Sequence, residues 1–127
     1  MFLTNVLVLL TLSAHPSSIS DSLLHHKYTI TLPDQPIHTQ KERWSEGVFC
    51  IYSFNDGASI ILTEGSLMEF SFQSYSFSKE IHNSGILDRK FWRHRSLNNV
   101  IEVYYYNVGR KSKRKYNRIL RSVKVIE

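Results

Sequence analysis

Short segments of this chain alternate hydrophobic and polar residues, the period of two that predicts a half-buried β-strand. The first of them is residues 27–32 (KYTITL), which Pro33 ends. The segment that follows, residues 34–47 (DQPIHTQKERWSEG), is polar and rich in turn residues. We therefore expect one early strand and then a connecting loop, in which Trp44 folds back onto the core.

The clearest local signal is that of a β-hairpin. Residues 47–54 (GVFCIYSF) and 58–63 (ASIILT) are apolar runs, and turn residues that include the pair Asp56-Gly57 separate them. An Asp-Gly pair accepts φ > 0 at both central positions of a tight turn, which is the turn that we predict here. A further turn then leads into residues 67–72 (LMEFSF), which alternate again and predict a third antiparallel strand.

Two more strands are predicted towards the C-terminus. Residues 73–87 show no clean period, and we expect a loop or a short helix there. Residues 90–95 (KFWRHR) and 100–108 (VIEVYYYNV) are typical of two strands joined by the turn 96–99 (SLNN). In the second strand, one face carries Ile101, Val103 and Tyr105, and the other carries Val100, Glu102, Tyr104 and Tyr106. Bulky residues on both faces favour a central position in the sheet.

The last segment is amphipathic at the helical period. Its apolar residues follow the spacing i, i+3, i+4 and i+7, at Tyr116, Ile119, Leu120 and Val123. This spacing predicts a helix over residues 111–123, with the apolar stripe on the sheet and the basic residues facing water. Together, the elements predict an α+β fold in which a C-terminal amphipathic helix packs on one face of an antiparallel β-sheet of about five or six strands.

The N-terminus has the layout of a secretory signal peptide. Residues 2–12 are mainly apolar, and the small and helix-breaking residues that follow predict cleavage after Ala14 or Ser20. Because no Lys or Arg precedes the apolar run, a buried first strand or helix is the alternative. The run is shorter than the about 20 apolar residues of a membrane-spanning helix. We expect a signal peptide at residues 1–20, a single α+β domain at residues 21–127, and export to the periplasm or the extracellular space.

Charge divides the chain into two unequal parts. Residues 1–88 hold four Lys or Arg and nine Asp or Glu, which gives a net charge of −5. Residues 89–127 hold twelve Lys or Arg and two Glu, which gives +10. An anionic partner would explain this division, and so would attraction between the two parts as one domain folds.

The positive charge is densest where the helix is expected to begin. The candidate binding surface consists of seven basic residues: Arg110, Lys111, Lys113, Arg114, Lys115, Arg118 and Arg121. Arg93 and Arg95 are expected to adjoin it. Lys113, Arg114 and Lys115 fall in the first helical turn, where the helix dipole makes each cation cost about 0.3–1 kcal/mol at low salt. Helix stability therefore does not explain them, which leaves solubility or a partner.

The expected partners are an anionic polysaccharide, a lipid headgroup or an acidic protein surface. Three tyrosines before a basic helix could also bind single-stranded nucleic acid, but Tyr105 points away from Tyr104 and Tyr106 in a strand. Export disfavours nucleic acid further.

No catalytic, metal or cofactor motif stands out in the sequence. Cys50 is the only cysteine, which excludes an internal disulfide, and its apolar neighbours predict a buried thiol. The histidines lack metal-ligand spacing, and the sequence contains neither a Gly-x-Ser-x-Gly motif nor a phosphate loop. We therefore expect a binding or accessory protein with no cofactor and no metal.

The alternative function is that of a small secreted phosphodiester hydrolase similar to a ribonuclease. Such an enzyme needs an acid, a base and cations that stabilise the phosphorane. His94, between Arg93 and Arg95 and opposite Glu102 across the predicted hairpin, could supply these groups.

Two stretches resemble segments of known proteins. Residues 52–65 (YSFNDGASIILTEG) and 105–125 (YYNVGRKSKRKYNRILRSVKV) are similar to small exported proteins of Bacteroidota, which place such a hairpin before a late strand and a terminal helix. The ending also resembles the PsbP-like fold, an antiparallel sheet backed by helices, although this chain lacks a clear helix between its early strands. The resemblance implies an α+β sandwich with a non-enzymatic accessory role, and it implies no catalytic residue.

Overall fold

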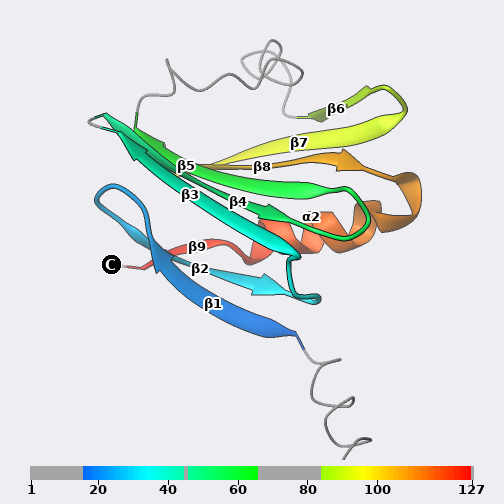
Figure 1. The fold of residues 1–127 in the computed structure, drawn as a ribbon. Coiled ribbons are helices and arrows are strands. Elements are labelled where there is room, and N and C mark those ends of the chain that lie inside the picture. Colours follow the sequence, from blue (N-terminus) through cyan, green and yellow to red (C-terminus); the bar gives the residue numbers. More distant parts are fainter. Residues whose placement is uncertain (1–15, 45, 66–83, 127) are drawn as a thin grey trace, which may run out of the picture.

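Two antiparallel sheets and one C-terminal helix make up the fold, which confirms the predicted α+β class (Figure 1). The computed structural model describes residues 16–44, 46–65 and 84–126. The larger sheet has the strand order β3 (His38–Trp44), β4 (Gly47–Ser53), β5 (Ser59–Gly65), β8 (Ile101–Val108), β7 (Lys90–Leu97) and β6 (Ser84–Leu87). The smaller sheet, which the sequence did not reveal, has the order β1 (Ser17–Ser22), β2 (Lys27–Leu32) and β9 (Lys124–Ile126).

The hydrophobic core lies between the six-stranded sheet and a second layer, which consists of the smaller sheet and helix α2 (Lys113–Ser122). Each of these parts contributes fully buried side chains, such as Tyr28 from β2, Ile60 from β5 and Tyr116 from α2. The opposite face of the six-stranded sheet carries a smaller cluster of Phe49, Ile61 and Tyr104. Strand β8 therefore packs on both faces, as its sequence predicts.

The predicted β-hairpin is confirmed, but the prediction of its turn was wrong. Strands β4 and β5 pair from Gly47 opposite Gly65 to Ser53 opposite Ser59. The backbone N–H of Phe54 donates to the Ala58 carbonyl, which closes a three-residue loop, and only Gly57 among the loop residues has a positive φ, of 88°. The Asp56 carboxylate accepts the backbone N–H of Ala58 at 3.0 Å, a contact typical of aspartate in turns.

The prediction of a loop over residues 34–47 was also wrong, because β3 occupies residues 38–44 and pairs with β4 along its whole length. This strand is at the edge of the sheet, and residues 38–43 are exposed. Because neither of its faces is buried, its sequence shows no alternation of hydrophobic and polar residues. The side chain of Trp44 lies outside the part of the chain that the structure describes.

The later strands match the prediction closely. Strands β7 and β8 form the expected hairpin, and the side chains of β8 alternate between the two faces as predicted. The second neighbour of β5 is β8, whereas the predicted third strand at residues 67–72 lies outside the described residues. At the end of the predicted irregular segment 73–87, Ser84–Leu87 form the short edge strand β6.

Helix α2 confirms the amphipathic prediction. Tyr116, Ile119, Leu120 and Val123 are all at most 2% exposed. A single 3-10 turn, η1 (Arg110–Ser112), precedes the helix, and the helix packs against β2 and β8. No helix of the described ranges has the length and apolar character that crossing a membrane requires.

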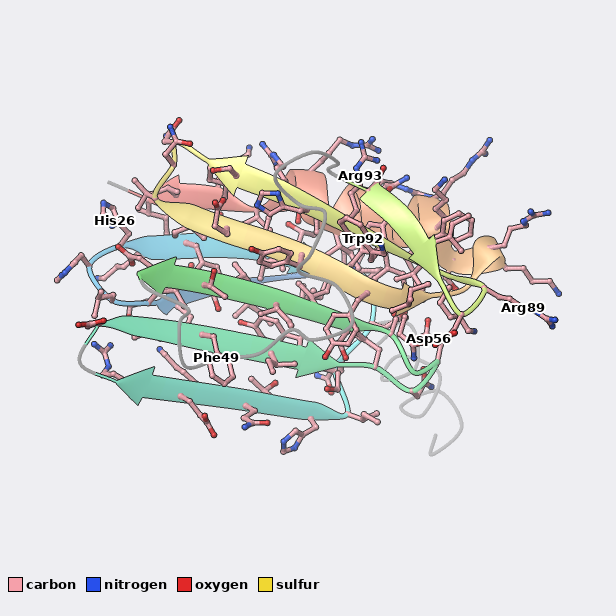
Figure 2. All side chains as sticks on the ribbon, turned by 90° about the horizontal axis from the view of Figure 1, so that it is seen from above. His26, Phe49, Asp56, Arg89, Trp92 and Arg93 are labelled. Carbon is pink, nitrogen blue, oxygen red and sulfur yellow. The ribbon has the colours of Figure 1, made fainter. Side chains whose placement is uncertain are left out.

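Two polar contacts join the layers at opposite ends of the six-stranded sheet, near His26 and near Asp56 (Figure 2). At one end, the buried carboxylate of Glu64 accepts the backbone N–H groups of His25 and His26 at 3.0 and 3.2 Å and lies 2.6 Å from Nδ1 of His26. At the other end, the Tyr116 hydroxyl lies 2.9 Å from both carboxylate oxygens of Asp56. We refer to these contacts as the Glu64 clasp and the Asp56 clasp.

Strand β1 lies across the predicted boundary between the signal peptide and the domain. It begins at Ser17 and pairs with β2 from Ser17 opposite Leu32 to Ser22 opposite Lys27. Cleavage after Ala14 would leave this strand whole, whereas cleavage after Ser20 would remove four of its six residues.

Candidate functional site

The seven basic residues of the predicted binding surface do not form one surface. Arg110 and Lys111 belong to η1, and the other five belong to α2. Lys113 and Arg121 line hollows on the side of the helix next to β7, whereas Lys115 and Arg118 line a hollow of about 320 Å³ next to Thr31 and Pro33. The charges are therefore spread around the exposed half of the helix.

Lys115 is part of the scaffold. Its ammonium group lies 2.9 Å from Oδ2 of Asp34 and 3.9 Å from Oδ2 of Asp56. The same group lies 5.2 Å from the centre of the Tyr116 ring. These acids compensate the charge of Lys115, which is thus a weaker candidate for binding a partner than the sequence suggests.

Lys113 also has a partner within the fold. Its ammonium group lies 4.4 Å from the centre of the Phe91 ring, a distance at which a cation is attracted to an aromatic face. The first turn of α2 contains no acidic residue, and the Ser112 side chain makes no capping hydrogen bond. Contacts to other elements, and not the helix itself, therefore account for Lys113 and Lys115. Arg114 is exposed and pairs with no acidic residue in the described ranges.

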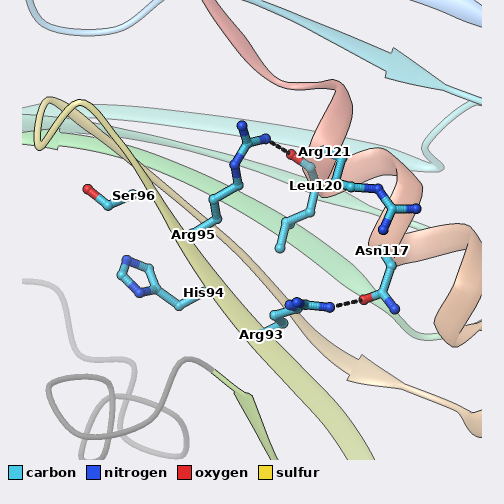
Figure 3. A pocket seen from close by; sticks show the side chains of 7 residues that line it. All are labelled: Arg93, His94, Arg95, Ser96, Asn117, Leu120 and Arg121. Carbon is cyan, nitrogen blue, oxygen red and sulfur yellow. Dashed lines mark hydrogen bonds between the residues drawn. The ribbon is translucent and has the colours of Figure 1, made fainter.

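A cleft between β7 and α2 brings together Arg93, Arg95 and Arg121, none of which pairs with an acidic residue in the described part of the chain (Figure 3). Its volume is about 450 Å³. The residues that line it are Arg93, His94, Arg95 and Ser96 of β7 and Asn117, Leu120 and Arg121 of α2. No acidic residue is among these lining residues, so the three arginines give the lining a net positive charge. We call it the arginine cleft.

Two of its arginines are held by neutral groups. Nη1 of Arg93 donates to Oδ1 of Asn117 at 3.1 Å, and Nη1 of Arg95 donates to the Leu120 carbonyl at 2.9 Å. The second contact places a cation on a carbonyl of the last helical turn, where the helix dipole favours positive charge. An amide and a carbonyl orient a guanidinium group without neutralising it, so both arginines keep their charge and most of their five N–H donors.

The strand separates His94 from the neighbouring arginines. Arg93 and Arg95 point towards the helix, whereas the His94 side chain points to the other side of β7 (Figure 3). There the imidazole stacks on Tyr104 with 4.8 Å between ring centres, and its Nε2 lies 3.2 Å from Oε2 of Glu102. The predicted proximity of His94 and Glu102 is thus present. The structure does not, however, bring the imidazole and the two guanidinium groups to one face, as the hydrolase mechanism requires.

Other titratable side chains in the core are structural. Cys50 is fully buried, as predicted, and burial raises the pKa of its thiol. The hydroxyl groups of Tyr28 and Tyr52 lie 2.6 Å apart, and burial raises both pKa values. Among the described residues, no three His, Cys, Asp or Glu side chains gather where they could hold a metal ion.

Sequence reasoning missed Asn117 as a member of the site. The spacing of these residues in the sequence could have indicated it. Arg93 and Arg95 are two positions apart on a strand, and Asn117 and Arg121 are four positions apart on a helix. Each pair therefore shares a face. Only the packing of α2 beside β7 brings the two pairs together.

Comparison with known proteins assigns neither a family nor a function to this chain. No protein-family model matches the chain, and no curated protein or solved structure is significantly similar to it. The resemblance to small exported Bacteroidota proteins and to the PsbP-like fold stays a prediction.

Proposed function

We propose that this chain is an exported protein that binds an anionic partner through the arginine cleft and the exposed basic residues of α2 beside it. The observation that carries the proposal is the cleft itself, in which Arg93, Arg95 and Arg121 meet without an acidic residue in the lining. Export is supported by the apolar N-terminal segment followed by small residues.

The cleft brings together three arginines that pair with no acidic residue in the described part of the chain, whereas two lysines of the fold have such partners. Lys41 and Lys115 each pair with an aspartate, at 3.1 and 2.9 Å. The arginines of the cleft have only neutral partners among the described residues. Gathering like charges in one place is unfavourable for folding, which makes a binding role a better explanation than stability.

Charge reversal at Arg114 and Arg121 should weaken binding to heparin, used here as a general polyanion. Both side chains are exposed, so the double variant R114E/R121E should fold normally. We expect about ten- to hundredfold weaker binding at low salt, because two charge-assisted contacts become repulsive. Elution from a heparin column with a salt gradient measures the effect.

The matched control is K27E/K124E, which changes the net charge equally at two exposed positions of the smaller sheet. Its elution should shift much less than that of R114E/R121E. Equal shifts would mean that only the overall charge matters, and the proposed site would be wrong.

A further inference from the structure

The charged groups of the arginine cleft are all hydrogen-bond donors, and the orientation of Asn117 adds one more donor. Oδ1 of Asn117 accepts both the Arg93 guanidinium at 3.1 Å and the Tyr105 hydroxyl at 2.7 Å. Burial raises the pKa of Tyr105, so this hydroxyl keeps its proton and donates. With its oxygen engaged twice, Asn117 is left with its NH₂ group for a ligand.

A site in which donors predominate selects a ligand rich in acceptors. Three guanidinium groups and one amide NH₂ offer N–H donors, and guanidinium groups match the planar pair of oxygens in carboxylate and sulfate groups. Hydroxyl oxygens beside such groups could accept the remaining N–H donors. The cleft volume of about 450 Å³ is within the usual range of ligand sites.

The cleft continues beyond Arg93. A second hollow of about 300 Å³ shares Arg93 with the arginine cleft and is lined further by residues of β6, β7, β8 and α2, among them Gly85, Trp92 and Lys113. A Cβ atom on Gly85 would lie 2.7 Å from the Trp92 indole nitrogen, so glycine is what lets the indole pack there. The two hollows meet at one arginine and so provide an elongated binding surface along β7.

The aromatic rings in this second hollow are not available for stacking. Trp92 is 5% exposed and Tyr105 is 1% exposed, and the ammonium group of Lys113 lies over the Phe91 ring. Single-stranded nucleic acid is bound mainly by stacking its bases on open rings, so these rings do not suit it. Arg95 is partly buried beside the helix, so a flat membrane surface would contact it less readily than the exposed Arg93 and Arg121.

We propose that the arginine cleft and its continuation past Arg93 bind a linear acidic polysaccharide, through carboxylate or sulfate groups on the arginines and hydroxyl groups on the remaining donors. This inference rests on the proposed function and makes it specific. A thin, flexible chain with oxyanions and hydroxyl groups fits an elongated cleft in which donors predominate.

The test is calorimetric titration of the full chain with a short oligogalacturonate and with a chondroitin sulfate oligosaccharide, which separate carboxylate from sulfate recognition. Fully methyl-esterified oligogalacturonate, which has no charge, is the matched control ligand and should not bind. We expect R93Q and R121Q each to weaken binding of the preferred oligosaccharide by about tenfold or more, the loss of one charge-assisted contact. The control variant K124Q, at an exposed position of β9, should bind like the unchanged protein.

The outcomes separate this inference from the proposed function. Binding of phosphatidylglycerol vesicles or of oligothymidylate without binding of either oligosaccharide would overturn the polysaccharide inference and leave the anion-binding function standing. Failure to bind heparin, vesicles and oligosaccharides alike would overturn both. If the oligosaccharides bind and K124Q weakens them as much as R93Q and R121Q do, the assignment to this cleft is wrong. Because Arg121 is exposed and forms no hydrogen bond or ion pair with the residues that the structure describes, R121Q can be measured even if R93Q is unstable.

Discussion

Replacement of Tyr116 by alanine should lower the free energy of unfolding by about 3–5 kcal/mol, the usual cost of removing a large buried aromatic side chain. Tyr116 is fully buried, and its ring packs edge-on against Phe54 with 5.7 Å between ring centres. Its hydroxyl also forms the Asp56 clasp. Chemical denaturation measures the loss, and the midpoint of thermal unfolding should fall by roughly 15 °C or more.

The matched control is Y116F, which keeps the ring and removes only the hydroxyl group. Because Asp56 is partly exposed, its carboxylate can bind water instead, and we expect a smaller loss of about 1–2 kcal/mol. Burial, followed by the hydrogen bond to Asp56, raises the pKa of Tyr116, so the hydroxyl stays a donor at neutral pH. If Y116F were as unstable as Y116A, the clasp and not the ring would hold the helix on the sheet.

Replacement of Glu64 by alanine should lower the free energy of unfolding by a similar amount, about 3–5 kcal/mol, which is typical for the loss of one partner of a buried polar pair. The Glu64 side chain is 6% exposed and accepts hydrogen bonds from two backbone N–H groups. Its removal would leave the turn between β1 and β2 without these acceptors. Urea denaturation at neutral pH gives the measurement.

Acid should weaken the same contact. Burial acts to raise the pKa of Glu64, but hydrogen bonds from the His25 and His26 backbone and from the His26 side chain outweigh it, and the pKa lies below the ordinary value of 4.5. A carboxylate with a lowered pKa in the folded state contributes stability that is present above the ordinary pKa and is lost as the pH falls through the folded value. The free energy of unfolding should therefore decrease as the pH falls below about 4.5.

The variant E64Q separates charge from shape, because it keeps an oxygen that can accept the two backbone N–H groups. It should be more stable than E64A, and its stability should fall less steeply than that of the unchanged protein below pH 4.5. Parallel pH profiles for E64Q and the unchanged protein would contradict this account of Glu64.

Local patterns in the sequence were sufficient for the elements that bury many apolar residues. Strand β2 and helix α2 show a period of two or 3.6 because one face of each meets the core. The hairpin of β4 and β5 was predicted instead from its two apolar runs and the turn residues between them, and both faces of β5 are buried. Strand β3 has neither pattern and was missed. Strand β9 was also missed, because its three residues become a strand only by pairing with β2, about 100 positions earlier in the chain.

The candidate site was predictable only in part, for the same reason. The sequence identifies the C-terminal third as basic, but charge compensation depends on contacts that no local pattern encodes. Asp34 neutralises Lys115 from 81 positions away, and Arg93 meets Asn117 from 24 positions away. The alternation of strand side chains could have separated His94 from Arg93 and Arg95 at the outset, since neighbours on a strand point to opposite faces.

The polar strand β1 forms one edge of the smaller sheet. Its residues (SSISDS) pair with β2 along six positions, and Asp21 ties the strand to Lys41 of β3. A mature chain that began at Asp21 would move the open edge of the smaller sheet from β1 to β2, with unpaired backbone groups next to Ile30 and Leu32. An open edge of this kind accepts a strand from another chain. Proteolytic processing after Ser20 would thereby replace a polar edge by one that carries apolar core residues and favours self-association.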